Sequence, residues 1–119
     1  MRGKKILICD DDIGIAEMLE MLLDEEGYIV SSELNSVNLI KRVENERPDL
    51  LLLDIWMPVI SGDQLLRVMK ASSDFKDIPV LMYSASTEGH KIAESSGADA
   101  FIEKPFHIDK LLKLIEKMI

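Results

Sequence analysis

The segment LLLLDIWMP, residues 50–58, carries the clearest fold signal in the chain. Its four consecutive leucines do not alternate with polar residues, as they would in a strand with one face in water. They therefore predict a strand buried on both faces, which is typical of a parallel sheet covered by helices. Asp54 follows the leucines directly, so this strand is expected to deliver a carboxylate to one edge of the sheet.

Four more apolar runs of the same character lie on either side of this segment. The five predicted strands are residues 5–9, 28–32, 50–53, 80–83 and 100–102. A stretch with helical periodicity follows each strand, and this alternation predicts an open, doubly wound parallel sheet of the α/β class. A closed barrel of β–α units is excluded, because it needs more units than the chain contains.

Apolar residues three or four positions apart indicate five helices. The side chains expected to face the sheet are, helix by helix, Ile15, Leu19, Leu22 and Leu23; Val37, Ile40 and Val43; Leu65, Leu66 and Met69; Ile92 and Ala93; and Ile108, Leu111, Leu112 and Ile115. The first helix is expected to end at Gly27 and the second before Pro48. Ser61 and Gln64 have the spacing of a capping box at the start of the third helix. The fourth, residues 88–96, has the fewest inward apolar positions.

Length, composition and charge restrict the class of protein. A chain of 119 residues, 47% hydrophobic and 30% charged, is expected to form one soluble domain, residues 1–119. Its formal net charge of -8 argues against direct binding to nucleic acid or to an anionic membrane. Cys9 is the only cysteine, so no internal disulfide can form. No apolar stretch is long enough for a signal peptide or a membrane span, and we expect a cytoplasmic protein.

Polar side chains gather where the predicted strands end. Asp10 and Asp11 follow the first strand, Asp54 the third and Ser84 the fourth, and Lys104 comes shortly after the fifth. Ligands of an open parallel sheet bind beyond the carboxyl ends of its strands. These side chains are therefore the candidates for chemistry.

Asp10, Asp11 and Asp54 would bring three like charges together. Two unit charges about 4 Å apart repel by roughly 4 kcal/mol at an effective dielectric constant of about 20, so the cluster requires protonation or a bound cation. Mg²⁺ fits best, because it is usually held by one or two carboxylates together with waters and phosphate oxygens; Mn²⁺ is the expected substitute. With Lys104 and the cation, the site is close to neutral before any phosphate arrives.

The same side chains are suited to phosphoryl transfer. A carboxylate is a weak nucleophile, so the incoming phosphoryl group must be polarised and held in line. Asp54 lies centrally in the expected sheet, where its oxygen can attack while the cation bridges that oxygen and a phosphoryl oxygen. Ser84 can donate a hydrogen bond to a second phosphoryl oxygen, and Lys104 can pair with a third.

Taken in order along the chain, these residues resemble the receiver domain of two-component response regulators. The matching motifs are Ile8-Cys9-Asp10-Asp11-Asp12, Leu53-Asp54-Ile55-Trp56-Met57-Pro58, Gly62, Ser84-Ala85, Gly97-Ala98-Asp99 and Lys104-Pro105-Phe106. Each motif is weak alone, but the ordered set covers the whole chain with nearly the family's usual spacing. The resemblance implies a flavodoxin-like sheet with strand order 2-1-3-4-5 and five helices.

The resemblance also implies a role for each matching position in the acid pocket. Asp54 corresponds to the phospho-acceptor and Asp11 to a direct metal ligand. Asp10 corresponds to a second acid that often acts through water. The backbone carbonyl of Trp56 corresponds to a further metal ligand.

Other matching positions correspond to the part of the site that responds to phosphate. Ser84 corresponds to the hydroxyl that moves toward the phosphoryl group and Lys104 to the lysine that pairs with it. Phe101 corresponds to the aromatic residue that rotates inward on activation. The Lys104–Pro105 bond resembles one that is often cis in the family.

Three features depart from the family pattern. Ser84 and Lys104 are 20 positions apart, a residue or two fewer than usual, which bears on the length of the fourth helix. Phe101 lacks the hydroxyl that a tyrosine would supply. Trp56 is bulky at the mouth of the site, and we hypothesise that it shields the acyl phosphate from water.

The favoured interpretation is a phosphorelay signalling switch. A sensor histidine kinase or a phosphotransfer protein would supply the phosphoryl group, and a downstream protein or output domain would respond to the phosphorylated form. Such a domain is not an enzyme for other substrates, although it catalyses its own phosphorylation and dephosphorylation.

Two other classes stay open. A phosphatase of the haloacid-dehalogenase type would use the first acid of an Asp-x-Asp motif, a spacing that Asp10 and Asp12 have, but Gly14 stands where threonine or valine is expected. A receiver-like protein-binding module would never be phosphorylated, and the complete set of acids, hydroxyl and lysine argues against it. In the favoured interpretation Asp12 only caps the first helix, and Cys9 packs inside its strand.

Overall fold

The computed structural model describes residues 3–85, 88–104 and 107–119. Within them the strands are β1 (Lys5–Cys9), β2 (Ile29–Glu33), β3 (Leu50–Asp54), β4 (Val80–Ser84) and β5 (Ala100–Glu103). The helices are α1 (Ile13–Glu25), α2 (Leu39–Glu46), α3 (Gly62–Lys70), α4 (Gly89–Ser96) and α5 (Ile108–Met118), and a short 3₁₀ turn, η1 (Ser36–Asn38), precedes α2. The expectation about the Lys104–Pro105 bond falls outside the described residues.

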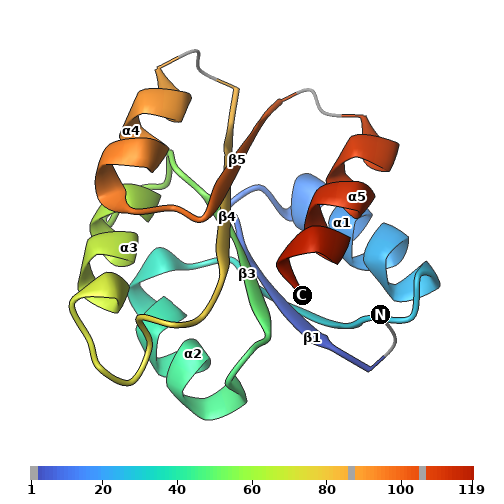
Figure 1. Ribbon diagram of the computed structural model, residues 1–119, viewed down its shortest axis with the longest axis horizontal. Coiled ribbons are helices and arrows are strands. Elements are labelled where there is room, and N and C mark those ends of the chain that lie inside the picture. Colours follow the sequence, from blue (N-terminus) through green and yellow to red (C-terminus); the bar gives the residue numbers. More distant parts are fainter. Residues whose placement is uncertain (1–2, 86–87, 105–106) are drawn as a thin grey trace.

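The strands form one parallel sheet in the order β2-β1-β3-β4-β5. This confirms both the α/β class and the strand order implied by the resemblance. In the register of the sheet, Cys9 pairs with Leu53, so Asp10 and Asp54 begin side by side. Asp54 in turn pairs with Tyr83 of β4. The carboxyl ends of the central strands therefore meet at one edge, at the top of Figure 1.

Helices cover both faces of the sheet. Helices α1 and α5 lie together on one face and α2, α3 and α4 on the other (Figure 1). All five residues of β3 are buried, as the unbroken leucine run predicted. Each fully buried leucine stabilises the fold by roughly 1.5–3 kcal/mol relative to an exposed one, so the central strand is held firmly between the two helical layers.

The expected helix ends are confirmed. The Asp12 carboxylate accepts hydrogen bonds from the backbone N–H groups of Gly14 and Ile15 at the start of α1. Helix α1 stops at Glu25, and Gly27 follows with a φ of 94°, a backbone conformation that favours glycine. Ser61 and Gln64 form the predicted capping box of α3.

The prediction for the start of α2 was wrong. Val37 is 53% exposed and belongs to η1, whereas Leu39 and Val43 carry the buried face of the helix. The 3₁₀ turn places Val37 outside the helix, so only this position was predicted incorrectly: Val43 is buried and Ile40 packs against the same core, as expected. Strand β2 also begins one residue later than predicted, and Tyr28 is a buried residue just before it.

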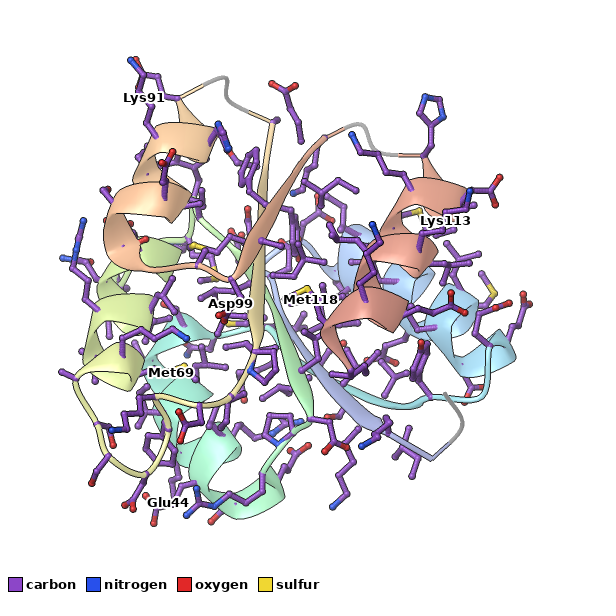
Figure 2. All side chains as sticks on the ribbon, viewed as in Figure 1. Glu44, Met69, Lys91, Asp99, Lys113 and Met118 are labelled. Atoms are coloured by element: carbon purple, nitrogen blue, oxygen red, sulfur yellow. The ribbon has the colours of Figure 1, made fainter. Side chains whose placement is uncertain are left out.

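Asp99 joins the far end of the sheet to α3. Its carboxylate accepts hydrogen bonds from the backbone N–H of Val80, at 2.8 Å, and from Lys70 Nζ, at 3.1 Å. Figure 2 shows Asp99 near the middle of the molecule, Met69 in the layer between α3 and the sheet, and Lys91 at the outer end of α4.

Within the described part of the chain, no helix combines the length and apolar character needed to cross a membrane.

Candidate functional site

The three predicted acids come together at the carboxyl edge of the sheet. Asp10 directly follows β1 and is fully buried, Asp54 ends β3 and is 5% exposed, and Asp11 is exposed. One carboxylate oxygen from each lies within 4.8 Å of those of the other two. Oxygen donors so closely grouped suit a hard divalent cation, so the residues present fit the expected metal.

Asp10 is held from two sides. Its Oδ1 accepts a hydrogen bond from the backbone N–H of Asp12 at 2.9 Å. Its Oδ2 accepts one from the hydroxyl of Tyr83 at 2.8 Å. A buried carboxylate that lacks such partners is costly, and here both oxygens have one. Tyr83 was not predicted as part of the site.

Asp54 is difficult to ionise in the absence of a cation. Its burial, together with the neighbouring charge of Asp10, raises the pKa of the Asp54 carboxyl to about 7, and Lys104 partly offsets this effect. The backbone N–H of Trp56 also donates a hydrogen bond to this carboxyl, which lowers its pKa. A positive ion among the acids would favour the carboxylate, which is the nucleophilic form.

Lys104 reaches the acid pocket from the end of β5. Its Nζ lies 3.6 Å from Asp10 Oδ2 and 3.8 Å from Asp54 Oδ1, which are ion-pair distances and too long for direct hydrogen bonds. The same Nζ lies 4.7 Å from the centre of the Tyr83 ring, a cation–π contact. The lysine therefore balances part of the negative charge of the two buried acids.

Ser84 and Phe101 lie together beside the start of α4. Ser84 is fully buried, and its backbone carbonyl accepts a hydrogen bond from the N–H of Lys104 at 2.8 Å. A Cβ placed on Gly89 would be 2.7 Å from Ser84 Cβ and 3.1 Å from Phe101 Cε1. The Phe101 ring is half-buried and lies 5.5 Å from the ring of His90. The two expected switch residues thus pack on the same turn of α4.

Trp56 lies on the loop between β3 and α3, two positions after Asp54. Its side chain is 51% exposed. The loop is closed by Gly62, whose backbone N–H donates to the carbonyl of Ile55 at 2.8 Å. The tryptophan is therefore close in sequence to Asp54 and about half covered by protein.

The cysteine is buried, whereas the two histidines are exposed. Cys9 is fully buried beside Met57, and burial raises the pKa of its thiol to about 12, so the thiolate is not formed near neutral pH. This confirms the prediction that Cys9 packs inside its strand. His90 and His107 are both exposed.

Sequence could not identify Tyr83 as a neighbour of Asp10. The two residues are 73 positions apart, and the alternation of β4 only places Tyr83 and Ser84 on opposite faces. That the phenol ring reaches past β3 to β1 depends on the width of two strands and on the side-chain rotamer. A tyrosine directly after the apolar run Val80-Leu81-Met82 is the signal that marks it.

Comparison with known proteins gives a consistent picture. The family model of the response regulator receiver domain matches residues 6–116. Sporulation initiation phosphotransferase F of Bacillus subtilis is 36% identical over 121 residues, an alignment that covers 100% of this chain and 96% of the relative. Response regulator MprA of Mycobacterium ulcerans is 31% identical over 117 residues, 97% of this chain.

The solved structure of chemotaxis response regulator CheY4 of Vibrio cholerae has the same fold. It superposes with a TM-score of 0.90 at 28% identity, over 98% of this chain and 99% of that one. The chain spans about half the length of MprA and of several other curated relatives that it matches.

Proposed function

The chain belongs to the response regulator receiver domain family of two-component signalling, and we propose that Asp54 is its phospho-acceptor. One observation carries the proposal. Asp54 ends the buried central strand with Asp10 and Asp11 oxygens within 4.8 Å and the Lys104 ammonium 3.8 Å away. A carboxylate nucleophile in such a setting has both cation ligands and a phosphate partner at hand.

In the proposed reaction, a carboxylate oxygen of Asp54 forms a bond to phosphorus as the bond between phosphorus and the donor breaks. With a phosphohistidine donor the bond that breaks is P–N, and the imidazole that leaves takes up a proton. The product is an acyl phosphate on Asp54. No general base is required, because the attacking carboxylate is already ionised.

Asp10, Asp11, Asp54 and the backbone carbonyl of Trp56 are the residues that we propose to hold Mg²⁺, for which Mn²⁺ is the expected substitute. For the three acids the support is the chemistry of the donors, which are carboxylate oxygens grouped within 4.8 Å of one another; the Trp56 carbonyl is proposed from the resemblance to the family. When bound, Mg²⁺ neutralises negative charge on the acids and on the phosphoryl oxygens. The positive charge would also keep Asp54 ionised below its raised pKa of about 7.

Ser84, Lys104 and Phe101 are proposed to convert phosphorylation into a change of shape. The new phosphoryl group adds roughly two negative charges, which Lys104 can pair with and to which the Ser84 hydroxyl can donate. Movement of Ser84 would vacate space beside Gly89 that the Phe101 ring can enter. The result is a shift in the relative populations of two conformations of α4, β5 and α5.

A sensor histidine kinase or a phosphotransfer protein is the proposed phosphoryl donor, and a downstream protein or output domain the proposed recipient of the signal. Support comes from the family and from similarity to the sporulation phosphotransferase over 96% of its length. Some relatives of twice the length are named as DNA-binding regulators. We propose no such binding for these residues, whose net charge is -8.

The test is to find which aspartate takes phosphate. The protein is incubated with Mg²⁺ and a small acyl phosphate donor, and the modified residue is identified by reduction with borohydride and peptide mass analysis. We expect modification of Asp54, its loss in Asp54→Asn, and no change in Asp74→Asn, an exposed control.

Two outcomes would contradict the proposal. Phosphate on Asp10 would favour a phosphatase of the haloacid-dehalogenase type. Failure to take phosphate or to bind millimolar Mg²⁺ would favour a protein-binding module that is never phosphorylated.

A further inference from the structure

Tyr83 connects the apolar core to the acid pocket. The residue is 1% exposed, and its ring packs in the layer between the sheet and helices α1 and α5, among Ile8, Leu52 and Leu111. Its hydroxyl donates to Asp10 Oδ2 at 2.8 Å. The face of its ring lies 4.7 Å from Lys104 Nζ. One side chain therefore contacts two charged groups of the site.

We propose that Tyr83 is a positioning residue. Its hydroxyl holds the Asp10 carboxylate in the orientation needed for cation binding, and its ring holds the Lys104 ammonium between Asp10 and Asp54. This inference rests on the proposed function and adds a residue to it.

The hydroxyl limits how Asp10 can turn. A carboxylate with one oxygen bonded to the Asp12 N–H and the other to the Tyr83 hydroxyl cannot rotate without breaking a buried hydrogen bond. Each oxygen still has a second lone pair, so it can donate that pair to a cation or accept a hydrogen bond from a water bound to the cation. Without Tyr83, Asp10 would be able to turn away from Asp54 and relieve the repulsion that a cation otherwise removes. Hydrogen bonds to ligating carboxylates typically raise metal affinity about 10–100-fold.

The ring limits where Lys104 can go. A lysine side chain is flexible and its ammonium is strongly hydrated, so its position in a pocket has to be set by its neighbours. Here the aromatic face lies on one side, and the two carboxylates lie at 3.6 Å and 3.8 Å. The ammonium is nearly equidistant from the two acids, where it can pair with a phosphoryl group without a large movement.

A purely structural role predicts something different. Any buried tyrosine hydroxyl needs a hydrogen-bond partner, and Asp10 could serve only as that partner. Loss of the hydroxyl would then change stability alone. Under the proposal it also weakens cation binding.

The experiment compares three variants of the full chain with the parent. Tyr83→Phe removes only the hydroxyl and keeps the ring, whereas Tyr83→Leu removes both. Tyr28→Phe is the matched control, because Tyr28 is the other tyrosine and is also buried, at 4% exposed. Mg²⁺ binding is followed by the fluorescence of Trp56, the only tryptophan, which lies two positions from Asp54. Thermal unfolding in EDTA reports stability separately.

We expect Tyr83→Phe to raise the Kd for Mg²⁺ about 10-fold or more, with Tyr28→Phe unchanged. At saturating Mg²⁺ and after phosphorylation, Tyr83→Leu is expected to show smaller shifts of the α4 and β5 amide signals than Tyr83→Phe, because only the leucine variant loses the ring that positions Lys104. If Tyr83→Leu does not fold, NMR of the parent replaces it: addition of Mg²⁺ should shift the ring resonances of Tyr83 and leave those of Tyr28 in place.

A Kd for Mg²⁺ in Tyr83→Phe within twofold of the parent would overturn the proposal, as would an equal loss in Tyr28→Phe. If the parent binds Mg²⁺ and takes phosphate on Asp54 while Tyr83→Phe does both equally well, only the role of Tyr83 is refuted. If the parent itself does neither, the proposed function is refuted, and the role of Tyr83 with it.

Discussion

At the scale of single residues, the burial of Asp54 determines how the site responds to pH. The pKa of this carboxyl is raised from 3.8 to about 7, mainly by burial and then by Asp10. Between these two values the folded protein keeps a proton that the unfolded chain has released. Folding therefore takes up a proton in this range, and the stability contributed by this residue falls as the pH rises. Above about pH 7 the energetic penalty of ionising this buried carboxyl is present in full.

Asp54→Asn removes this penalty, because an amide does not ionise. We expect the free energy of unfolding of the variant to exceed that of the parent by about 1–3 kcal/mol at pH 8 in metal-free buffer. The pKa difference sets an upper limit of about 4 kcal/mol. The advantage should shrink toward pH 5, as measured by urea unfolding. Added Mg²⁺ should stabilise the parent more than the variant at pH 8, and an advantage that does not change with pH would contradict this explanation.

Trp56 is expected to affect the lifetime of the proposed acyl phosphate. Its side chain is 51% exposed, and its backbone N–H donates a hydrogen bond to the Asp54 carboxyl. If it keeps water from the phosphoryl group, Trp56→Asn should lose phosphate roughly several-fold faster than the parent once the donor is removed. Trp56→Phe, which keeps an aromatic ring, should fall between the two. An unchanged or slower decay in Trp56→Asn would contradict the shielding hypothesis.

At the scale of elements, two glycines set how closely helices approach the site. Gly62 brings the start of α3 against the backbone of β3, where a Cβ would lie 2.1 Å from the Asp54 carbonyl oxygen. Gly89 brings α4 against Ser84 and Phe101. Helix α4 forms with 8 residues despite the short spacing between Ser84 and Lys104, and its contact with β4 and β5 depends on the glycine.

Gly62→Ala should destabilise the protein strongly. The contact is with backbone, which cannot rotate away, so either β3 or the start of α3 has to move. We expect a loss of about 3 kcal/mol or more in the free energy of unfolding. Gly14→Ala is the control. Its Cβ would meet only the Asp12 side chain, at 3.2 Å, and alanine favours a helix by up to about 1 kcal/mol. Equal losses in the two variants would show that the close approach is not the cause.

At the scale of the whole molecule, the site depends on the ends of four strands at once. Strands β1 and β3 supply the acids, β4 supplies Ser84 and Tyr83, and β5 leads to Lys104. The acids and Lys104 are connected on one side to the core under α1 and α5 through Tyr83. On the other side, Ser84 and Phe101 contact α4. We therefore expect a charge added at Asp54 to affect both helical layers.

Lys104→Ala should still allow phosphorylation of Asp54 but should abolish the conformational change that follows it. The variant keeps the three acids, so it is expected to take phosphate from a small donor in Mg²⁺. It lacks the cation that pairs with the new charge, so amide signals of α4 and β5 should not shift on phosphorylation as they do in the parent. NMR spectra of both forms provide the measurement. Lys113→Ala is the control, because Lys113 is exposed on α5 (Figure 2). A normal shift in Lys104→Ala would refute this role.

The elements and the acid pocket were largely predictable because their signals are local. Each buried strand is a short apolar run, and in a parallel sheet the residue after each run lies at the same edge. Asp10, Asp11, Asp54 and Lys104 could therefore be grouped without a structure. The exposure of Val37 could not be predicted, because the 3₁₀ turn at Ser36–Asn38 places it outside α2, whereas Ile40 and Val43 face the core as predicted.

The sequence by itself determined the order of the elements, the burial of β3 and which charged residues share an edge, because hydrophobic runs and strand direction decide these features. Only the tertiary structure decided that the Tyr83 hydroxyl meets Asp10, that the Lys104 ammonium lies over the same ring, and that Ser84 packs against Gly89. These contacts depend on sheet register, strand spacing and side-chain rotamers, which join residues far apart in the chain and leave no periodic pattern in it.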